Sequence, residues 1–177
     1  MKNVLIAGCS RCGKTTISKY LKKKYNLNFY KMDSIKRGID KNFWDGYKDD
    51  WEKVSPHMAK LISTIINESE REYLVIDSCH LYPKDIVKYD LKNTIIVFVG
   101  HDTISIEKKL KQIRKYDHHA WTNFKDDDYM RYSTRLGIEY SIEARKQCEE
   151  LGIKYFDTSK NFLKVRKEII EYIEEKL

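Results

Sequence analysis

Residues 3–16 read NVLIAGCSRCGKTT, and the rest of the chain is best understood from this stretch. Within it Gly8, Gly13, Lys14 and Thr15 match the pattern G-x-x-x-x-G-K-[ST]. The apolar residues before Gly8 are typical of a buried strand, and the residues after the pattern are compatible with a helix. A strand, a glycine-bounded loop and a helix N-terminus in this order predict a loop that binds phosphate groups.

The residue types of this loop suit phosphate chemistry. Glycine allows backbone angles and a close approach that a Cβ atom would obstruct, and N–H groups at a helix N-terminus attract phosphate oxygens. Lys14 can reach the β- and γ-phosphates of a nucleoside triphosphate, and the Thr15 hydroxyl can ligate Mg²⁺. We therefore expect the nucleotide to be bound by Gly8, Cys9, Ser10, Arg11, Cys12, Gly13, Lys14, Thr15 and Thr16.

Composition bounds the class of protein. The chain has 177 residues, of which 41% are hydrophobic and 34% charged, and this fits one globular domain over residues 1–177. No apolar run approaches membrane-spanning length, so we expect no membrane partner. The apolar run before Cys9 is too short for a signal peptide, whose core needs ~7–15 residues. We therefore expect a cytoplasmic protein.

The net charge of +7 favours anionic ligands, which include phosphates and nucleic acid. Lysine-rich solvated helices account for the same charge, so the charge alone identifies no partner. Cys9 and Cys12 form a C-x-x-C pair inside the loop. Zinc there would compete with phosphate for the same backbone and would need further ligands. The remaining alternatives are a redox-sensitive loop or, as we favour, small side chains in a reduced protein.

Hydrophobic periodicity predicts alternating strands and helices, which favours a parallel sheet covered by helices. The helix that starts near residue 56 is expected to be capped by Ser55, with Pro56 in its first turn. Strands are expected at residues 3–7, 28–32, 73–76, 94–99 and 153–156. Helices are expected at residues 14–24, 34–39, 56–69, 83–88, 103–115, 132–151 and 161–176.

Two carboxylates follow predicted strands. In an open parallel sheet, ligands bind outside the carboxyl ends of the strands, so Asp33 and Asp77 should lie near Lys14. Asp77 suits a Mg²⁺ ligand, directly or through water, and its alternative role is a turn residue or a helix cap. Asp33 could accept the proton of a substrate hydroxyl or grip the acceptor, and its alternative role is an N-cap.

The loop, the two strand-end carboxylates and an arginine-bearing segment before a late helix resemble the adenylate kinase and shikimate kinase group of small P-loop phosphotransferases. The resemblance implies a three-layer α/β P-loop NTPase fold. Its five-stranded parallel sheet has the order 2-3-1-4-5, with helices on both faces. It also implies an acceptor-binding segment at residues 33–70 and a mobile lid at residues 116–133.

By position in that group, Asp33, Lys36 and Arg37 would bind the acceptor. Arg131 and Arg135 stand one helical turn apart and would neutralise charge on the transferred phosphoryl group, so they join Lys14 and Asp33 as predicted catalytic residues. The alternative for each arginine is a surface ion pair.

The chain departs from both kinds of kinase on the acceptor side. Residues 78–83 read SCHLYP where adenylate kinases have Gly-Phe-Pro-Arg, and Ile35 stands where shikimate kinases have a second Asp. The same side is rich in aromatic residues, which either stack on an acceptor or pack their own segment against the core. These aromatic residues are Tyr30, Phe43, Trp44, Tyr47, Trp51 and Tyr82, with His80 beside them.

These features predict an ATP-dependent kinase that uses Mg²⁺ and phosphorylates a small molecule, such as a nucleoside, a nucleotide or a hydroxylated metabolite. One alternative is a kinase acting on polynucleotide ends, for which nucleic acid would be the partner. A second alternative is a regulatory module that binds nucleotide without phosphotransfer. A GTPase switch is not supported, because the chain has no Asn-Lys-x-Asp motif.

Overall fold

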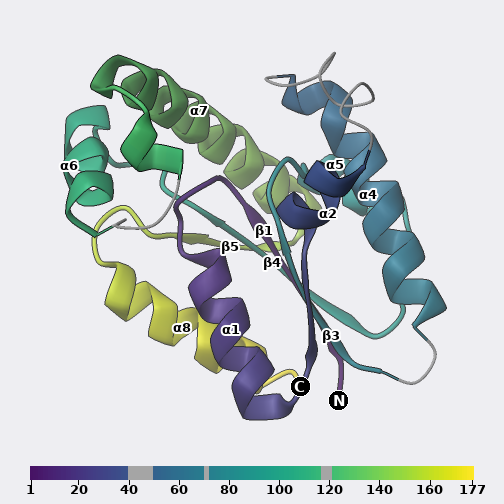
Figure 1. Cartoon of the computed structure of the whole chain (residues 1–177). Helices are drawn as coiled ribbons and strands as arrows, with labels where there is room; N and C mark the ends of the chain where they lie inside the picture. The colour runs from purple at the N-terminus through teal and green to yellow at the C-terminus, as the bar shows by residue number, and fades with distance from the viewer. Residues whose placement is uncertain (40–49, 70–71, 117–120) are drawn as a thin grey trace.

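The computed structural model describes residues 1–39, 50–69, 72–116 and 121–177. Its centre is a sheet of five parallel strands in the order β2-β3-β1-β4-β5, so the predicted order is confirmed (Figure 1). The strands are β1 (Asn3–Gly8), β2 (Asn28–Lys31), β3 (Leu74–Ser78), β4 (Thr94–Gly100) and β5 (Lys154–Asp157).

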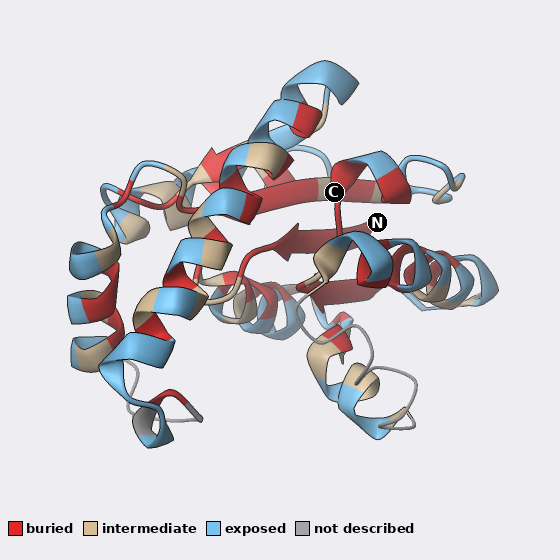
Figure 2. Cartoon of the chain, turned by 90° about the horizontal axis from the view of Figure 1, so that it is seen from above, coloured by how far each residue is buried: buried red, intermediate tan, exposed pale blue. Residues whose placement is uncertain are grey.

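The central strands are largely buried and carry apolar runs, because helices cover both faces of the sheet, as is typical of parallel sheets (Figure 2). On one face lie α1 (Lys14–Tyr25) and α8 (Phe162–Glu174), which contact each other (Figure 1). The other face carries α4 (Trp51–Glu68), α5 (Pro83–Ile86) and α7 (Asp127–Leu151). The remaining elements are α2 (Met32–Gly38), α6 (Ile106–Tyr116) and the 3₁₀ turn η1 (Trp121–Phe124).

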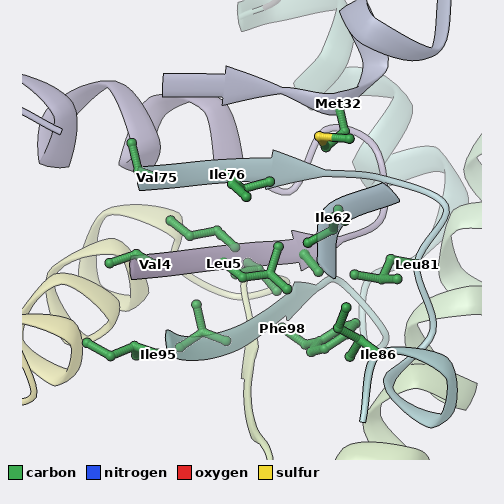
Figure 3. Close-up of a cluster of buried hydrophobic side chains, with 14 of the residues drawn as sticks. Val4, Leu5, Met32, Ile62, Val75, Ile76, Leu81, Ile86, Ile95 and Phe98 are labelled. Atoms are coloured by element: carbon green, nitrogen blue, oxygen red, sulfur yellow. The ribbon is translucent and has the colours of Figure 1, made fainter. Parts of the chain in front are cut away.

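The core between the sheet and these helices is closely packed. Leu5 of β1, Ile76 of β3 and Phe98 of β4 are fully buried, and Ile62 of α4 and Met32 of α2 pack over them (Figure 3). This packing fixes the carboxyl ends of β1, β2 and β3 relative to one another, which is the edge where the site is built.

Among the helix starts that differ from the predictions, those of α4 and α7 differ most. The cap predicted at Ser55 is wrong: α4 begins at Trp51, and the Asp50 side chain accepts a hydrogen bond from the Lys53 N–H. Ser55 is instead buried, and its hydroxyl donates to the Asp85 carboxylate at 2.6 Å. Serine suits both roles, and only the contact with α5 decides between them.

The second difference is at α7, which begins at Asp127 rather than at residue 132. The Asp126 carboxylate caps it by accepting from the Tyr129 N–H at 2.8 Å, and acidic residues stabilise the first turn of a helix. Residues 127–133 of the predicted lid therefore lie on a helix. Phe43, Trp44 and Tyr47 lie outside the described residues. Among the described helices, none is long and apolar enough to span a membrane.

Candidate functional site

The predicted phosphate loop connects β1 to α1. Gly8 and Gly13 have positive φ angles of 144° and 94°. A Cβ atom on Gly8 would lie 1.8 Å from the Val99 carbonyl oxygen, and one on Gly13 would lie 2.1 Å from the Phe162 ring. Both positions therefore require glycine, for the backbone angle and for the space.

Lys14 is the buried cation of this loop, with a residue exposure of 4%. Its ammonium donates to the Cys9 carbonyl oxygen at 2.5 Å and to the Cys79 sulfur at 3.1 Å. Burial lowers the pKa of Lys14, but attraction to Cys12, Cys79 and Asp77 outweighs burial and raises that pKa well above its ordinary value. Lys14 is therefore a permanent positive charge beside the loop backbone.

Asp77 and Thr15 lie together at the end of β3. The Thr15 hydroxyl donates a hydrogen bond to the Asp77 carboxylate, which is almost completely buried. Burial raises the pKa of Asp77, and the positive charge of Lys14 partly counteracts that rise. One hydroxyl and one carboxylate fit the oxygen-rich shell of Mg²⁺, which in nucleotide sites keeps several waters and phosphate oxygens as its other ligands.

The cysteines of the loop face the protein interior. Cys9 and Cys12 are buried and form no disulfide, and the Cys9 sulfur lies 3.2 Å from Nδ1 of His101. Burial and the neighbouring Cys12 raise the pKa of Cys9, and burial lowers the pKa of His101 to about 3. Both groups are therefore neutral near pH 7 and pack behind the loop.

Two adjacent cavities, which share lining residues, lie at the carboxyl edge of the sheet. The large cavity, of about 860 Å³, is lined by the loop residues 13–16, by Asp77, by Thr158 and by residues 160–163. The small cavity, of about 300 Å³, is lined by α2 residues, by Trp51 and His80, and by Tyr129, Met130, Ser133, Thr134, Leu136 and Gly137 of α7. Residues that line both are Ser10, Arg11, Asp33, Arg37, Lys109 and Ile113.

The structure brings most of the predicted site residues to these cavities. Lys14, Thr15 and Asp77 line the large cavity, Lys36 lines the small one, and Asp33 and Arg37 line both. Gly8, Cys9 and Cys12 line neither cavity, because they form the inner side of the loop.

The two predicted lid arginines lie outside both cavities. Arg131 forms ion pairs with Glu107 at 2.9 Å and with Asp128 at 3.0 Å, and Arg135 is exposed on α7. Their spacing does place them one turn apart on a helix, as predicted. Their role at the phosphates remains a prediction.

Sequence reasoning did not single out Lys109, which lines both cavities. Its side chain on α6 is buried, and its ammonium donates to the Arg11 carbonyl oxygen at 2.8 Å. Burial is the main cause that lowers the pKa of Lys109. Lys109 stands three residues after Ile106 and four before Ile113, which places it on the apolar face of that helix. This spacing could have indicated from the sequence that the Lys109 side chain is buried.

Comparison with known proteins finds solved structures with a similar fold. No protein-family model matches the sequence, and no curated protein matches it. Shikimate kinase from Bacteroides thetaiotaomicron superposes with a TM-score of 0.60 at 15% identity, over 98% of each chain. A gluconokinase from Sinorhizobium meliloti 1021 gives a TM-score of 0.59 at 11% identity, over 98% of this chain and 92% of that one. Deoxyadenosine kinase from M. mycoides gives a TM-score of 0.53 at 16% identity, over 97% of this chain and 99% of that one.

The sheet order, the loop and these neighbours define the class to which the fold belongs. The chain has the three-layer P-loop fold of small-molecule kinases, as the resemblance in sequence implied. The neighbours named above act on different acceptors by name, so fold alone selects no substrate.

Proposed function

We propose that the protein is an ATP-dependent phosphotransferase that acts on a small-molecule acceptor. The observation that carries this proposal is the position of Asp33, which lines both the large and the small cavity. A carboxylate at that junction stands between a nucleotide in one cavity and an acceptor hydroxyl in the other. A kinase needs a proton acceptor at this point.

On the nucleotide side, residues 8–16 bind the triphosphate of ATP. Backbone N–H groups at the start of α1 face the phosphates, and the Lys14 ammonium exchanges its contact with the Cys9 carbonyl for phosphate oxygens. Thr15 and Asp77 would hold Mg²⁺, which neutralises phosphate charge when bound. Lys109 and Arg11 add positive charge where the two cavities meet.

On the acceptor side, Lys36 and Arg37 of α2 position the acceptor and Asp33 accepts the proton of its hydroxyl. We assign residues 33–70 to this acceptor segment and residues 116–133 to a lid, within one domain. Closing the lid would exchange the ion pairs of Arg131 for contacts with the phosphates, and Arg135 would follow one turn later. Exclusion of water then favours transfer to the acceptor over hydrolysis of ATP.

The cysteines agree with a reducing cytoplasmic environment. Cys9, Cys12, Cys79 and Cys148 are all free, and free thiols are typical of proteins kept in a reducing compartment.

The test is ADP release from ATP and Mg²⁺ across a panel of nucleosides, nucleotides and hydroxylated metabolites, with mass spectrometry of the acceptor. We expect one acceptor to raise ADP release and to gain one phosphoryl group. Asp33→Asn should lower that transfer by about 10²–10⁴-fold while ATP binding stays intact. Asp90→Asn, at an exposed position, is the matched control. ATP binding without transfer to any acceptor would instead support a regulatory module.

A further inference from the structure

Three polar atoms without a partner belong to residues of the small cavity. Among the described residues, none forms a hydrogen bond with Oδ1 of Asp33, Nδ1 of His80 or Oγ1 of Thr134. All three residues line the small cavity. Buried polar atoms normally have a hydrogen-bond partner, so three such atoms around one cavity indicate a ligand that supplies the missing bonds.

The three atoms come from different parts of the chain. Asp33 lies on α2 after β2, His80 follows β3, and Thr134 lies on α7. The His80 backbone has a φ of 56°, and its ring contacts the Trp51 ring at a tilt of 52° with the centroids 4.6 Å apart. Thr134 is 5% exposed. The fold therefore holds these groups in place from three independent elements.

Their chemistry matches hydroxyl groups. Burial, aided by the positive charge of Lys36, lowers the pKa of His80 to about 4, so its imidazole is neutral near pH 7. A neutral imidazole nitrogen either donates or accepts, a threonine hydroxyl does both, and a carboxylate oxygen accepts. A ligand hydroxyl can satisfy each of these partners.

The positive charge of the small cavity places a second requirement on the ligand, which is a negative charge. Four cationic residues line it, and Asp33 is the single carboxylate among the described residues that do. A volume of about 300 Å³ is at the small end of ligand cavities. The cationic residues are Arg11, Lys36, Arg37 and Lys109.

We propose that His80 and Thr134 are the specificity residues of the acceptor site, and that they bind a second hydroxyl of a small polyhydroxylated anion. Asp33 then faces the hydroxyl that receives the phosphoryl group, a role that rests on the proposed function. The cationic residues of the cavity balance the negative charge of the acceptor.

The experiment measures binding by calorimetry without nucleotide, so that it does not depend on turnover. The probes are gluconate and shikimate as polyhydroxylated anions, glucitol as the uncharged counterpart of gluconate, and hexanoate as its counterpart without hydroxyls. We expect at least one polyhydroxylated anion to bind at millimolar concentration or below, and glucitol and hexanoate to bind at least about tenfold more weakly.

Variants then assign the hydrogen bonds. His80→Phe keeps an aromatic ring against Trp51 and removes both nitrogens, and we expect it to weaken binding of that anion by about tenfold. His80→Asn carries a polar atom near the place of Nδ1 and tolerates the positive φ, so it should restore most of the affinity. Thr134→Val should weaken binding similarly, and Thr134→Ser should not. Thr94→Val, near the opposite end of the sheet, is the control.

The outcomes separate the two proposals. Binding of a polyhydroxylated anion without phosphoryl transfer would overturn the kinase proposal and leave the specificity site standing. Transfer to deoxyadenosine, with no binding of the polyhydroxylated anions, would overturn the specificity site and leave the kinase proposal standing. Equal affinity in His80→Phe and the unmodified protein, with urea midpoints showing that both are folded, would also overturn the role of His80. The same result in Thr134→Val would overturn the role of Thr134.

Discussion

In the large cavity the key polar groups bond to one another, whereas in the small cavity they do not. Lys14 donates to the Cys9 carbonyl, and Thr15 donates to Asp77. Asp33, His80 and Thr134 each keep an atom without a partner among the described residues. The comparison teaches that the polar groups of the large cavity are satisfied within the protein, whereas those of the small cavity leave hydrogen bonds for the ligand that we propose. After the proposed roles, the two are called the phosphate side and the acceptor side.

The largest effect should come from removing the cation of the phosphate side. Lys14→Ala deletes a buried positive charge aimed at phosphate, so we expect kcat/KM for ATP to fall on the order of 10²–10³-fold. Nucleotide titration and ADP release measure the loss. Lys19→Ala, at an exposed position of the same helix, should change neither. Unchanged ATP affinity in Lys14→Ala would contradict the assignment of the phosphate side.

A pair of glycine variants contrasts the backbones of the two sides. Gly8→Ala puts a Cβ atom 1.8 Å from the Val99 carbonyl oxygen at a positive φ, so we expect it to lower the free energy of unfolding by about 4 kcal/mol. Gly38→Ala on α2 meets no atom within 4 Å, and should raise the free energy of unfolding by about 0.4–1 kcal/mol. Urea unfolding compares the two. Similar values for both variants would show that the loop backbone is not constrained as described.

The histidine of the acceptor side should give the protein a specific pH dependence. The unfolded chain protonates His80 below about pH 6.5, whereas the folded protein keeps it neutral down to a pKa of about 4. The unfolded state binds more protons in this window, so stability falls as the pH drops from 6.5 to 4 and the loss levels off below it. We expect His80 to account for roughly 2–3 kcal/mol of that loss.

The check is urea unfolding of the unmodified protein and of His80→Asn at pH 7.5, 5.5 and 4. The variant should lose less stability over this range, because other titrating groups are common to both proteins. Identical pH profiles would mean that folding leaves the pKa of His80 at its ordinary value.

The smallest effect concerns the support of the acceptor side. The Ser55 hydroxyl donates to Asp85 and accepts from the Tyr82 N–H at 2.7 Å, which joins α4 to the turn that carries His80. Ser55→Ala leaves both partners buried without it, so we expect a loss of about 2 kcal/mol in the free energy of unfolding. Affinity for the acceptor should fall while affinity for ATP does not.

Ser34→Ala, at an exposed position, is the control for that variant and should stay within about 0.5 kcal/mol of the unmodified protein. Equal losses of acceptor and ATP affinity in Ser55→Ala would show that the two sides of the site are not independent.

The sequence alone determined the glycine-bounded loop and the parallel sheet, whereas the order of the strands followed from the resemblance to small P-loop kinases. The loop from Gly8 to Thr15 is one continuous segment, so its spacing specifies its geometry, and the apolar strands with their intervening helices specify a parallel sheet. Asp33 and Asp77 could be placed because the carboxyl ends of parallel strands share one edge.

Only the tertiary structure decided which other residues join Asp33, Lys36 and Arg37 around the small cavity. His80, Trp51, Lys109 and Thr134 lie far apart in the sequence, and each has an ordinary alternative as a packed aromatic, a surface lysine or a helix residue. Their convergence depends on how α2, α4, α6 and α7 pack at the edge of the sheet. The start of α4 shows the same limit, since Asp50 and Ser55 are both good caps by residue type and the contact of Ser55 with Asp85 chose between them. Local patterns specify groups that one short segment holds together, whereas packing between segments specifies the rest.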